Sequence, residues 1–327
     1  MPDFLSPRRA VLTGTGAYLP EQIVTNEELA KRVDTSDEWI TERTGIKQRH
    51  FSAPFETATF MGAAAGRAAL AAAGLAPEAL GAIIVGTSTP DNAFPATAVQ
   101  IQAALGAKNA FGFDLAAACS GFIYGLSVAD AMIRAGQVES MLVIGTEVYS
   151  RILNFEDRGT CVLFGDGAGA VLLQARDVPK DGAGILSTHL HADGSLGDIL
   201  YVDGATGRHG MSAHLVMNGR EVFRHAVSLL AGAVTEALAA NGLTAADIDF
   251  LVPHQANKRI IDGVGKKLGL PPERVIVTVD KHANTSAASI PLALHTAITD
   301  GRIKPGQLIL LEALGGGLTW GSALIRL

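Results

Sequence analysis

Short apolar segments alternate along the chain with longer segments whose apolar residues follow a helical period. The stretch from Phe113 to Phe122 is typical of a short buried strand that gives way to small residues. The apolar spacing from Ile123 to Ile133 is typical of a packed helix. A second buried strand, 251–253, leads to His254, and another helix is expected directly after it. This alternation predicts an α/β protein.

The pattern repeats in the two halves of the chain. Each half contains a Gly-Leu helix end with a buried strand after it, then a strand and a helix that end near a glycine, then a glycine-rich turn and an apolar strand. The matches pair 74–86 with 242–254, 113–136 with 277–301, and 164–173 with 314–325. Three matches in one order predict two tandem αβ units of roughly 150 residues each. We expect an N-terminal half at 1–177, and a linker with the C-terminal half at 178–327.

The repeat also predicts which reactive residues could meet. Aligning Gly136 with Gly301 sets Cys119 opposite Asn284, each at the start of an equivalent helix. His254 then stands at the end of a strand in the second half. If the halves pack about a pseudo-twofold axis, these helix starts converge on one cleft.

An uneven region from about 178 to 219 separates the halves. It contains an alternating segment, 185–191, and loop-like segments at 194–197 and 204–207 that could form a pocket wall. His189 and His191 fall on one face of the alternating segment. No third ligand stands at a suitable spacing, so no metal site is predicted.

Composition narrows the class of protein. Apolar residues make up 48% and charged residues 18%, which favours a large packed core. The net charge of −6 argues against a general nucleic-acid-binding protein. Two cysteines, Cys119 and Cys161, are too few for a disulfide framework or a zinc site, and Cys161 is expected in the core. The start of the chain has no apolar signal core, and no apolar run nears the length of a membrane span, so a soluble cytoplasmic protein is expected.

Cys119 is the first candidate for chemistry. A cysteine at a helix start feels the positive end of the helix dipole, which lowers the pKa of the thiol and favours the nucleophilic thiolate. The small residues around it allow a substrate to approach closely. A buried cysteine that only fills space is the alternative interpretation.

His254 and Asn284 are the second and third candidates. Taken separately, His254 could be a core histidine and Asn284 a helix N-cap. Together with Cys119 they suggest acyl chemistry, which papain-like proteases also perform with a Cys-His-Asn set. The local signatures of those proteases are absent, and the Ala-rich surroundings of Cys119 suit a narrow acyl tunnel. Gly315–Gly317 could turn backbone N–H groups toward an oxyanion, or could form a plain tight turn.

The sequence resembles the β-ketoacyl-acyl-carrier-protein synthase III family of thiolase-like condensing enzymes, essentially from end to end. The resemblance rests on four motifs: 113–122 around Cys119, Val252–Asn257, Asn284–Ser289 and Gly315–Gly321. It implies a five-layered αβαβα fold of two pseudo-symmetric halves and a homodimer. It also implies an initiating enzyme of type II fatty acid synthesis that uses acyl-CoA and malonyl-acyl-carrier protein as substrates and needs no cofactor.

The resemblance implies a role for each reactive residue. Cys119 would accept an acyl group, normally acetyl, from CoA. His254 and Asn284 would bind the thioester carbonyl of the malonyl group and steady the enolate that forms as carbon dioxide leaves. The backbone N–H groups of Cys119 and Gly316 would form the oxyanion hole.

The resemblance also indicates binding residues. Trp39 and Arg158 would hold the adenine of CoA, Arg43 its phosphates, and Phe94 would reach the partner subunit's acyl pocket. Met217 and Phe223 would line the pantetheine tunnel, and Gly219 is also assigned to substrate binding. Basic residues beside the active-site strand would bind the acidic carrier protein, although an ordinary solvated face is the alternative. The residues assigned to that contact are Arg224, Gln255, Lys258, Arg259 and Lys266.

The chain departs from the family pattern at several positions. Lys281-His282-Ala283 stands where many members have an aromatic residue and a glycine, and Leu314 and Leu318 replace common aromatic residues. We expect these changes to alter the pocket lining and the preferred chain length. Specialised relatives that use long-chain or aromatic acyl groups stay possible, as does a silent acyl-CoA-binding protein. A nicotinamide oxidoreductase is disfavoured, because 14–19 and 165–169 lack the required glycine spacing.

Overall fold

Two stacked β-sheets form the framework of the protein. The computed structural model describes residues 8–179, 182–204 and 214–327. Its first sheet has the strand order β1-β7-β6-β4-β5, and its second has the order β11-β12-β13-β8. The first sheet comprises β1 (Arg8–Tyr18), β7 (Asp166–Asp177), β6 (Ser140–Val148), β4 (Ala82–Gly86) and β5 (Phe111–Leu115). The second comprises β11 (Phe250–Pro253), β12 (Leu308–Gly315), β13 (Thr319–Arg326) and β8 (Gly184–Ala192).

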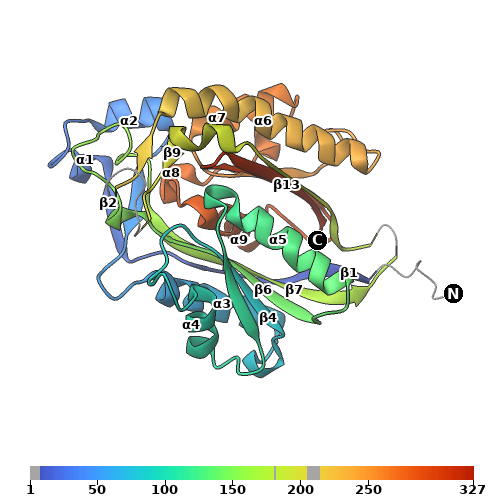
Figure 1. Cartoon of the computed structure of the whole chain (residues 1–327). Helices are drawn as coiled ribbons and strands as arrows, with labels where there is room; N and C mark the ends of the chain where they lie inside the picture. The colour runs from blue at the N-terminus through green and yellow to red at the C-terminus, as the bar shows by residue number, and fades with distance from the viewer. Residues whose placement is uncertain (1–7, 180–181, 205–213) are drawn as a thin grey trace.

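Helices complete five layers (Figure 1). The middle layer, between the sheets, holds α5 (Gly121–Arg134) and α9 (Ser289–Thr299). One outer layer holds α3 (Ala58–Ala73) and α4 (Thr97–Leu105), and the other holds α6 (Gly219–Ala240) and α7 (Lys258–Lys267). The αβαβα fold expected from the family resemblance is therefore confirmed.

Shorter elements lie around this framework. Two further sheets have two antiparallel strands each. They are β2 (Gln22–Thr25) with β3 (Gln48–Phe51), and β9 (Leu200–Tyr201) with β10 (Val216–Met217). The short α-helices are α1 (Asn26–Leu29), α2 (Asp37–Thr44) and α8 (Val279–His282). The 3₁₀ turns are η1 (Pro77–Ala79), η2 (Ala118–Ser120), η3 (Tyr149–Arg151), η4 (Gly194–Ile199), η5 (Pro272–Arg274) and η6 (Ser286–Ala288).

Burial explains the strand sequences. β4 and β6 run parallel in the middle of the first sheet, and every residue of both strands is buried. Strands covered on both faces read as continuous apolar runs, as these do. In the second sheet, the odd positions of β12 (Ile309, Leu311, Ala313) join the cluster around α5 and α9, and the even positions join the cluster beneath α6 and α7.

Close backbone contacts seat the middle layer on the first sheet. A side chain on Gly145 of β6 would overlap the carbonyl oxygen of Ala287 in η6. A Cβ on Gly86 of β4 would lie 2.8 Å from the carbonyl carbon of Gly121, where α5 begins. These glycines bring the starts of α5 and α9 against neighbouring strands of the first sheet.

The repeat is less regular at the helix starts than the sequence suggested. α5 has 14 residues and α9 has 11, so the two helices match at their glycine ends but not at their beginnings. Asn284 therefore lies two residues before η6 and does not start a helix. Matching the helix starts instead pairs Ala118 with Ser286, and both have positive φ, 44° and 50°.

The strand predicted at the start of 277–301 does not form, and the backbone just before it makes only an isolated bridge, between Val275 and Leu251. The side chain of Gln255 takes the place of a neighbouring strand. Its Oε1 accepts hydrogen bonds from the N–H groups of Thr278 (2.8 Å) and Val279 (3.1 Å), and its Nε2 donates to the carbonyl of Ile276 (3.1 Å). These hydrogen bonds satisfy the backbone groups of 276–279 without pairing to a neighbouring strand. Helix α8 begins directly afterwards.

Helix α6 is the one described helix whose length and mean hydropathy would allow it to cross a membrane. In this fold its apolar face, which includes Leu230, Val234 and Leu238, is buried in the cluster shared with β12 and α7. Core helices of globular proteins pass the same test of length and composition.

Glu312 of β12 is a buried carboxyl group without a hydrogen-bond partner in the described part of the chain. It has the same strand parity as Leu310 and Leu314 and so belongs to the face beneath α6 and α7. It is 1% exposed, and neither carboxyl oxygen is hydrogen-bonded. Burial raises the pKa of this group to about 8, so it is held in its neutral form.

This burial predicts how stability depends on pH. The unfolded chain releases the Glu312 proton near pH 4.5, whereas the folded chain retains it up to about pH 8. The contribution of this group is therefore complete below pH 4.5 and is lost as the pH rises toward 8, by about 1.4 kcal/mol per pH unit. Between pH 6 and pH 8, we expect the free energy of unfolding to fall by about 2 kcal/mol less in Glu312→Gln than in the wild type. Denaturant unfolding at the two pH values measures this difference. Parallel pH profiles for the two proteins would contradict the assignment.

Candidate active site

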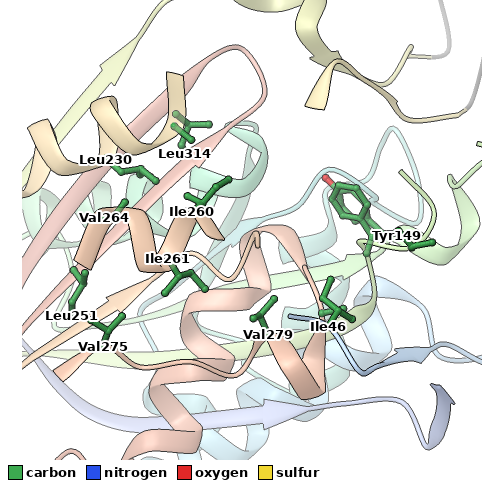
Figure 2. Close-up of a cluster of buried hydrophobic side chains, with 14 of the residues drawn as sticks. Ile46, Tyr149, Leu230, Leu251, Ile260, Ile261, Val264, Val275, Val279 and Leu314 are labelled. Carbon is green, nitrogen blue, oxygen red and sulfur yellow. The ribbon is translucent and has the colours of Figure 1, made fainter. Parts of the chain in front are cut away.

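Cys119, His254 and Asn284 open on one cavity of about 590 Å³. Its lining comes from both halves of the chain. It also includes Gly197, Leu200, Tyr201, Val202, Leu215 and Met217, so the region between the halves forms a wall of the pocket, as the sequence suggested. Residues 180–181 and 205–213 of that region lie outside the described residues. Apolar side chains of α6, α7 and β12 form another wall, where Leu230, Ile260 and Leu314 lie together (Figure 2).

Cys119 lies in η2, directly before α5, and is 5% exposed. Burial raises the pKa of its thiol to about 12, and hydrogen bonds involving Ser286 and Tyr149 act in the opposite direction. The expectation of a lowered pKa from the helix dipole is therefore wrong. Loss of water outweighs the dipole, and the resting group is a thiol.

His254 follows β11, and its backbone N–H donates to the carbonyl of Glu312 (2.8 Å). Burial lowers the pKa of the imidazole to about 3, so the ring is neutral at physiological pH. Its Nδ1 lies 2.6 Å from the Oγ of Ser289, the first residue of α9. A neutral imidazole can donate one hydrogen bond, as the sequence-based mechanism requires.

Asn284 is fixed by its own backbone and by its side-chain oxygen. Its N–H donates to Leu163 (2.9 Å) and its carbonyl accepts from Gly165 (3.0 Å), which ties it to the N-terminal half. Its Oδ1 accepts from the N–H of Ser286 (2.8 Å). Because the oxygen is engaged, the Nδ2 amide group is the end that can donate to a ligand.

The backbone is strained around these residues. Ala118, Ala283 and Ser286 are the non-glycine residues with positive φ in the described ranges, and each adjoins Cys119 or the Asn284 turn. Ala283 has φ 56° and ψ −160°, a conformation that glycine adopts far more readily. Strain of this kind persists only where the surrounding packing enforces it, and Ala283 is fully buried.

The departures from the family pattern do not all line the pocket. Leu314 does, whereas Lys281, His282, Ala283 and Leu318 do not. The expectation that all of them alter the lining is therefore wrong. The 281–283 segment instead forms the backbone that leads into Asn284. Among these departures, Leu314 is therefore the one that an acyl chain in the cavity would contact.

The proposed oxyanion donors lie next to each other. A Cβ on Gly315 would be 2.7 Å from the backbone nitrogen of Cys119, so the glycine turn rests directly on η2. Gly316 lines the cavity beside it.

The residues assigned to CoA form one group. Ser36 caps α2 by accepting from the N–H of Trp39, and the guanidinium groups of Arg43 and Arg158 lie 4.6 and 5.4 Å from the centre of the Trp39 ring. Trp39 and Arg43 line the cavity, and so do Met217, Gly219 and Phe223. Phe94 lies outside the cavity and is 87% exposed.

The basic residues differ in their freedom to bind a partner. Arg224 pairs with Glu221 (2.7 Å), and Lys258 pairs with Asp262. Arg259 and Lys266 of α7 are exposed, and neither forms an ion pair in the described part of the chain. Gln255 is fully buried and holds the 276–279 backbone, so its assignment to the carrier-protein contact is wrong.

The sequence reasoning missed a polar network behind the cysteine. Glu147 is buried at the end of β6 and accepts hydrogen bonds from the N–H of Ser88 (3.0 Å) and the hydroxyl of Thr89 (2.7 Å). Burial raises its pKa to about 7. The hydroxyl of Tyr149 donates to that of Ser286 (3.1 Å). The sequence signal that could have revealed this network was the polar residues at the end of an otherwise apolar strand, β6.

Two further observations complete the site. Cys161 is a fully buried free thiol in the core. Residues 8–179, 182–204 and 214–327 contain no cluster of three or more His, Cys, Asp or Glu side chains suited to a metal ion. His189 and His191 both contact Glu236 instead.

Comparisons with known proteins agree with this geometry. Residues 113–194 match the family model described as 3-oxoacyl-[acyl-carrier-protein (ACP)] synthase III, and residues 238–327 match the model of its C-terminal part. The β-ketoacyl-[acyl-carrier-protein] synthase III of Acidiphilium cryptum is 72% identical, over 98% of this chain and 99% of that protein.

Solved structures share the fold at lower sequence identity. The 3-oxoacyl-[acyl-carrier-protein] synthase III of Aquifex aeolicus has a TM-score of 0.92 at 47% identity, covering 97% of this chain and 100% of that one. A priming β-ketosynthase from a polyketide biosynthetic pathway has a TM-score of 0.91 at 38% identity, covering 100% and 99%. By sequence and by fold, the chain belongs to the β-ketoacyl-acyl-carrier-protein synthase III family.

Proposed function

We propose that this protein condenses an acyl group from acyl-CoA, normally acetyl, with malonyl-acyl-carrier protein and so initiates type II fatty acid synthesis. The observation that carries the proposal is the single cavity shared by Cys119, His254 and Asn284. Both thioesters are substrates, and the proposed chemistry needs no bound cofactor. We place the reaction in the cytoplasm, where both substrates are made.

The first half-reaction transfers the acyl group. The sulfur of Cys119 attacks the thioester carbonyl, the new S–C bond forms, and the bond to the CoA sulfur breaks. Because burial keeps Cys119 protonated at rest, its proton leaves as the acyl group arrives and is taken up by the departing CoA thiolate. We assign stabilisation of the tetrahedral oxyanion to the backbone N–H groups of Cys119 and Gly316.

The second half-reaction forms the carbon–carbon bond. The malonyl thioester loses carbon dioxide, and the electron pair of the broken bond becomes an enolate. The Nε2 of His254 and the Nδ2 of Asn284 donate to its oxygen. The enolate carbon attacks the acyl-Cys119 carbonyl and forms the new C–C bond, and the S–C bond to Cys119 breaks. The sulfur leaves as a thiolate and takes up a proton from solvent, so the overall reaction consumes one proton. Two half-reactions through one cysteine give ping-pong kinetics.

Substitutions separate these roles. Cys119→Ala should lose acyl transfer and condensation together. His254→Ala and Asn284→Ala should retain acylation of Cys119 and lose about 10²–10³-fold in malonyl decarboxylation, as removal of one oxyanion donor does elsewhere. Intact-protein mass spectrometry measures the acyl-enzyme, and release of carbon dioxide measures the second step. Normal decarboxylation by either variant would contradict the division of roles.

The same mass measurement identifies the acyl donor. Acetyl-CoA, octanoyl-CoA and anthraniloyl-CoA are supplied separately, and malonyl-acyl-carrier protein is then added. Acetyl transfer to Cys119 followed by discharge supports initiation of fatty acid synthesis. Labelling by a longer or aromatic group alone would place the protein in a specialised branch, like the polyketide priming enzyme it resembles. No acyl-enzyme with any donor would favour a silent acyl-CoA-binding protein.

We propose that the acidic carrier protein docks over α7 at the entrance to the cavity. Asn257 and Ile260 of this segment line the cavity, and Arg259 lies exposed between them along the chain. The Nδ2 of Asn257 also donates to the carbonyl of Arg43 (3.3 Å), which joins this segment to the CoA-binding group.

Charge reversal tests this surface. Arg259→Glu should raise KM for malonyl-acyl-carrier protein at least about tenfold, more at low salt than at high salt, because exposed charges are screened by salt. Its acetyl transfer from CoA should change little. Lys304→Glu, at an exposed lysine of the loop before β12, makes the same change in net charge and serves as the control. Equal effects of the two variants would argue against docking at α7.

We propose that two chains pair through β5, the edge strand of the first sheet. Its backbone has neighbouring β4 on one side only, and Phe111 on this strand is 47% exposed. Phe94, on the loop before α4, would then reach the partner subunit.

Sedimentation equilibrium measures the pairing. The protein should have twice the mass of one chain, and Phe111→Asp should shift it toward the monomer, because an edge that buries a carboxylate pairs poorly. Phe223→Asp at the cavity is the control, since Phe223 is 44% exposed and lies on α6, on the far side of the second sheet from β5. A monomeric wild-type protein would contradict the proposal.

A further inference from the structure

The hydroxyl of Ser289 contacts the reactive histidine from behind. Its Oγ lies 2.6 Å from the Nδ1 of His254 and accepts a hydrogen bond from the backbone N–H of Gln255 (3.2 Å). Ser289, His254 and Gln255 are all buried. Burial also lowers the pKa of His254 far below neutrality, so the ring carries one proton, on either Nδ1 or Nε2.

Counting hydrogen atoms decides between the two tautomers. The Gln255 N–H can only donate, so it occupies one lone pair of the serine oxygen. If Nδ1 of His254 also donated to that oxygen, the hydroxyl hydrogen of Ser289 would need another acceptor. No other acceptor contacts this hydroxyl within the described residues. A buried polar hydrogen left without a partner is unfavourable.

The opposite arrangement satisfies every group. Ser289 accepts from Gln255 and donates its own hydrogen to Nδ1, which then carries a lone pair. The ring proton must reside on Nε2. That nitrogen is the one not engaged by serine, and His254 lines the cavity.

We propose that Ser289 is a positioning residue that fixes His254 in the Nε2–H tautomer, so that the imidazole meets the malonyl thioester as a hydrogen-bond donor. The inference rests on the proposed condensation and adds a residue to it. No proton is transferred between serine and histidine. The wrong tautomer would present a lone pair to the carbonyl oxygen and would repel the enolate.

Nitrogen-15 NMR of the intact, histidine-labelled protein tests the tautomer directly. The ring signals of His254 are identified by their absence in His254→Ala. We expect a protonated Nε2 and an unprotonated Nδ1 in the wild type, and a mixed or reversed pattern in Ser289→Ala. Ser289→Thr keeps the hydroxyl and should keep the wild-type pattern. Protonation at Nδ1 in the wild-type protein overturns the proposal, whatever the variants do.

Kinetics supply the second readout. Ser289→Ala should lower malonyl decarboxylation about tenfold or more while acetyl transfer to Cys119 stays within about twofold. In a His254→Ala background it should have no further effect, because it acts through the ring. Ser140→Ala is the matched control: its buried hydroxyl also accepts from a backbone N–H, of Gly81, and donates to a carbonyl, of Ala79. Equal loss of both half-reactions in Ser289→Ala would show a merely structural role.

These readouts also separate failure of this inference from failure of the proposed function. If the wild type forms no acyl-enzyme, the condensation is wrong, yet the NMR pattern still decides the tautomer. If condensation proceeds and Nδ1 carries the proton, only the role of Ser289 is wrong.

Discussion

Backbone contact across glycines is the constraint on which this active site depends. Gly86 and Gly145 let the starts of the two middle-layer helices rest against the first sheet, and Gly315 lets the turn after β12 rest on the backbone nitrogen of Cys119. A side chain at any of these positions would push apart segments that carry the cysteine, the asparagine turn and the proposed oxyanion donors. The packing of the main chain therefore fixes the geometry of the site, and the reactive side chains extend from these fixed segments.

That close packing also excludes water, and the loss of water determines the charge of every reactive group. Burial raises the pKa of Cys119 and lowers that of His254, so both are neutral at rest. Neutral groups act through the direction of their hydrogen bonds. This is why the partners behind them matter: Ser286 engages the oxygen of Asn284, and Ser289 engages one nitrogen of His254. Fixed donors of this kind need no reorganisation when charge develops on the substrate.

Much of this was accessible from the sequence, because it depends on local patterns. The strand before Cys119, the strand that delivers His254 and the tandem repeat each follow from the order of residue types. The expected burial of the first strand is wrong, because β5 is an edge strand and is only partly covered. The layered fold and the site residues came from family motifs. What escaped were effects of long-range packing. The raised pKa of Cys119 depends on how deeply η2 is buried. At the start of 277–301, where a strand was predicted, the backbone is instead bound by the side chain of Gln255, which follows β11. Gln255 looked like an exposed polar neighbour of a basic helix, and only the fold shows that it is buried.

The neutrality of the cavity has a further consequence for the malonyl group. Arg43 is the one arginine or lysine among the described lining residues, and it sits beside Trp39, in the group assigned to CoA. Under the proposed function, the malonyl carboxylate enters a largely apolar space where no cation is placed beside the reacting atoms to receive it. A buried anion without a counter-charge is strongly destabilised. Loss of carbon dioxide turns that localised charge into an enolate whose oxygen faces the two donors. The pocket thus destabilises the malonyl carboxylate that enters it and stabilises the enolate that forms. Both effects favour decarboxylation.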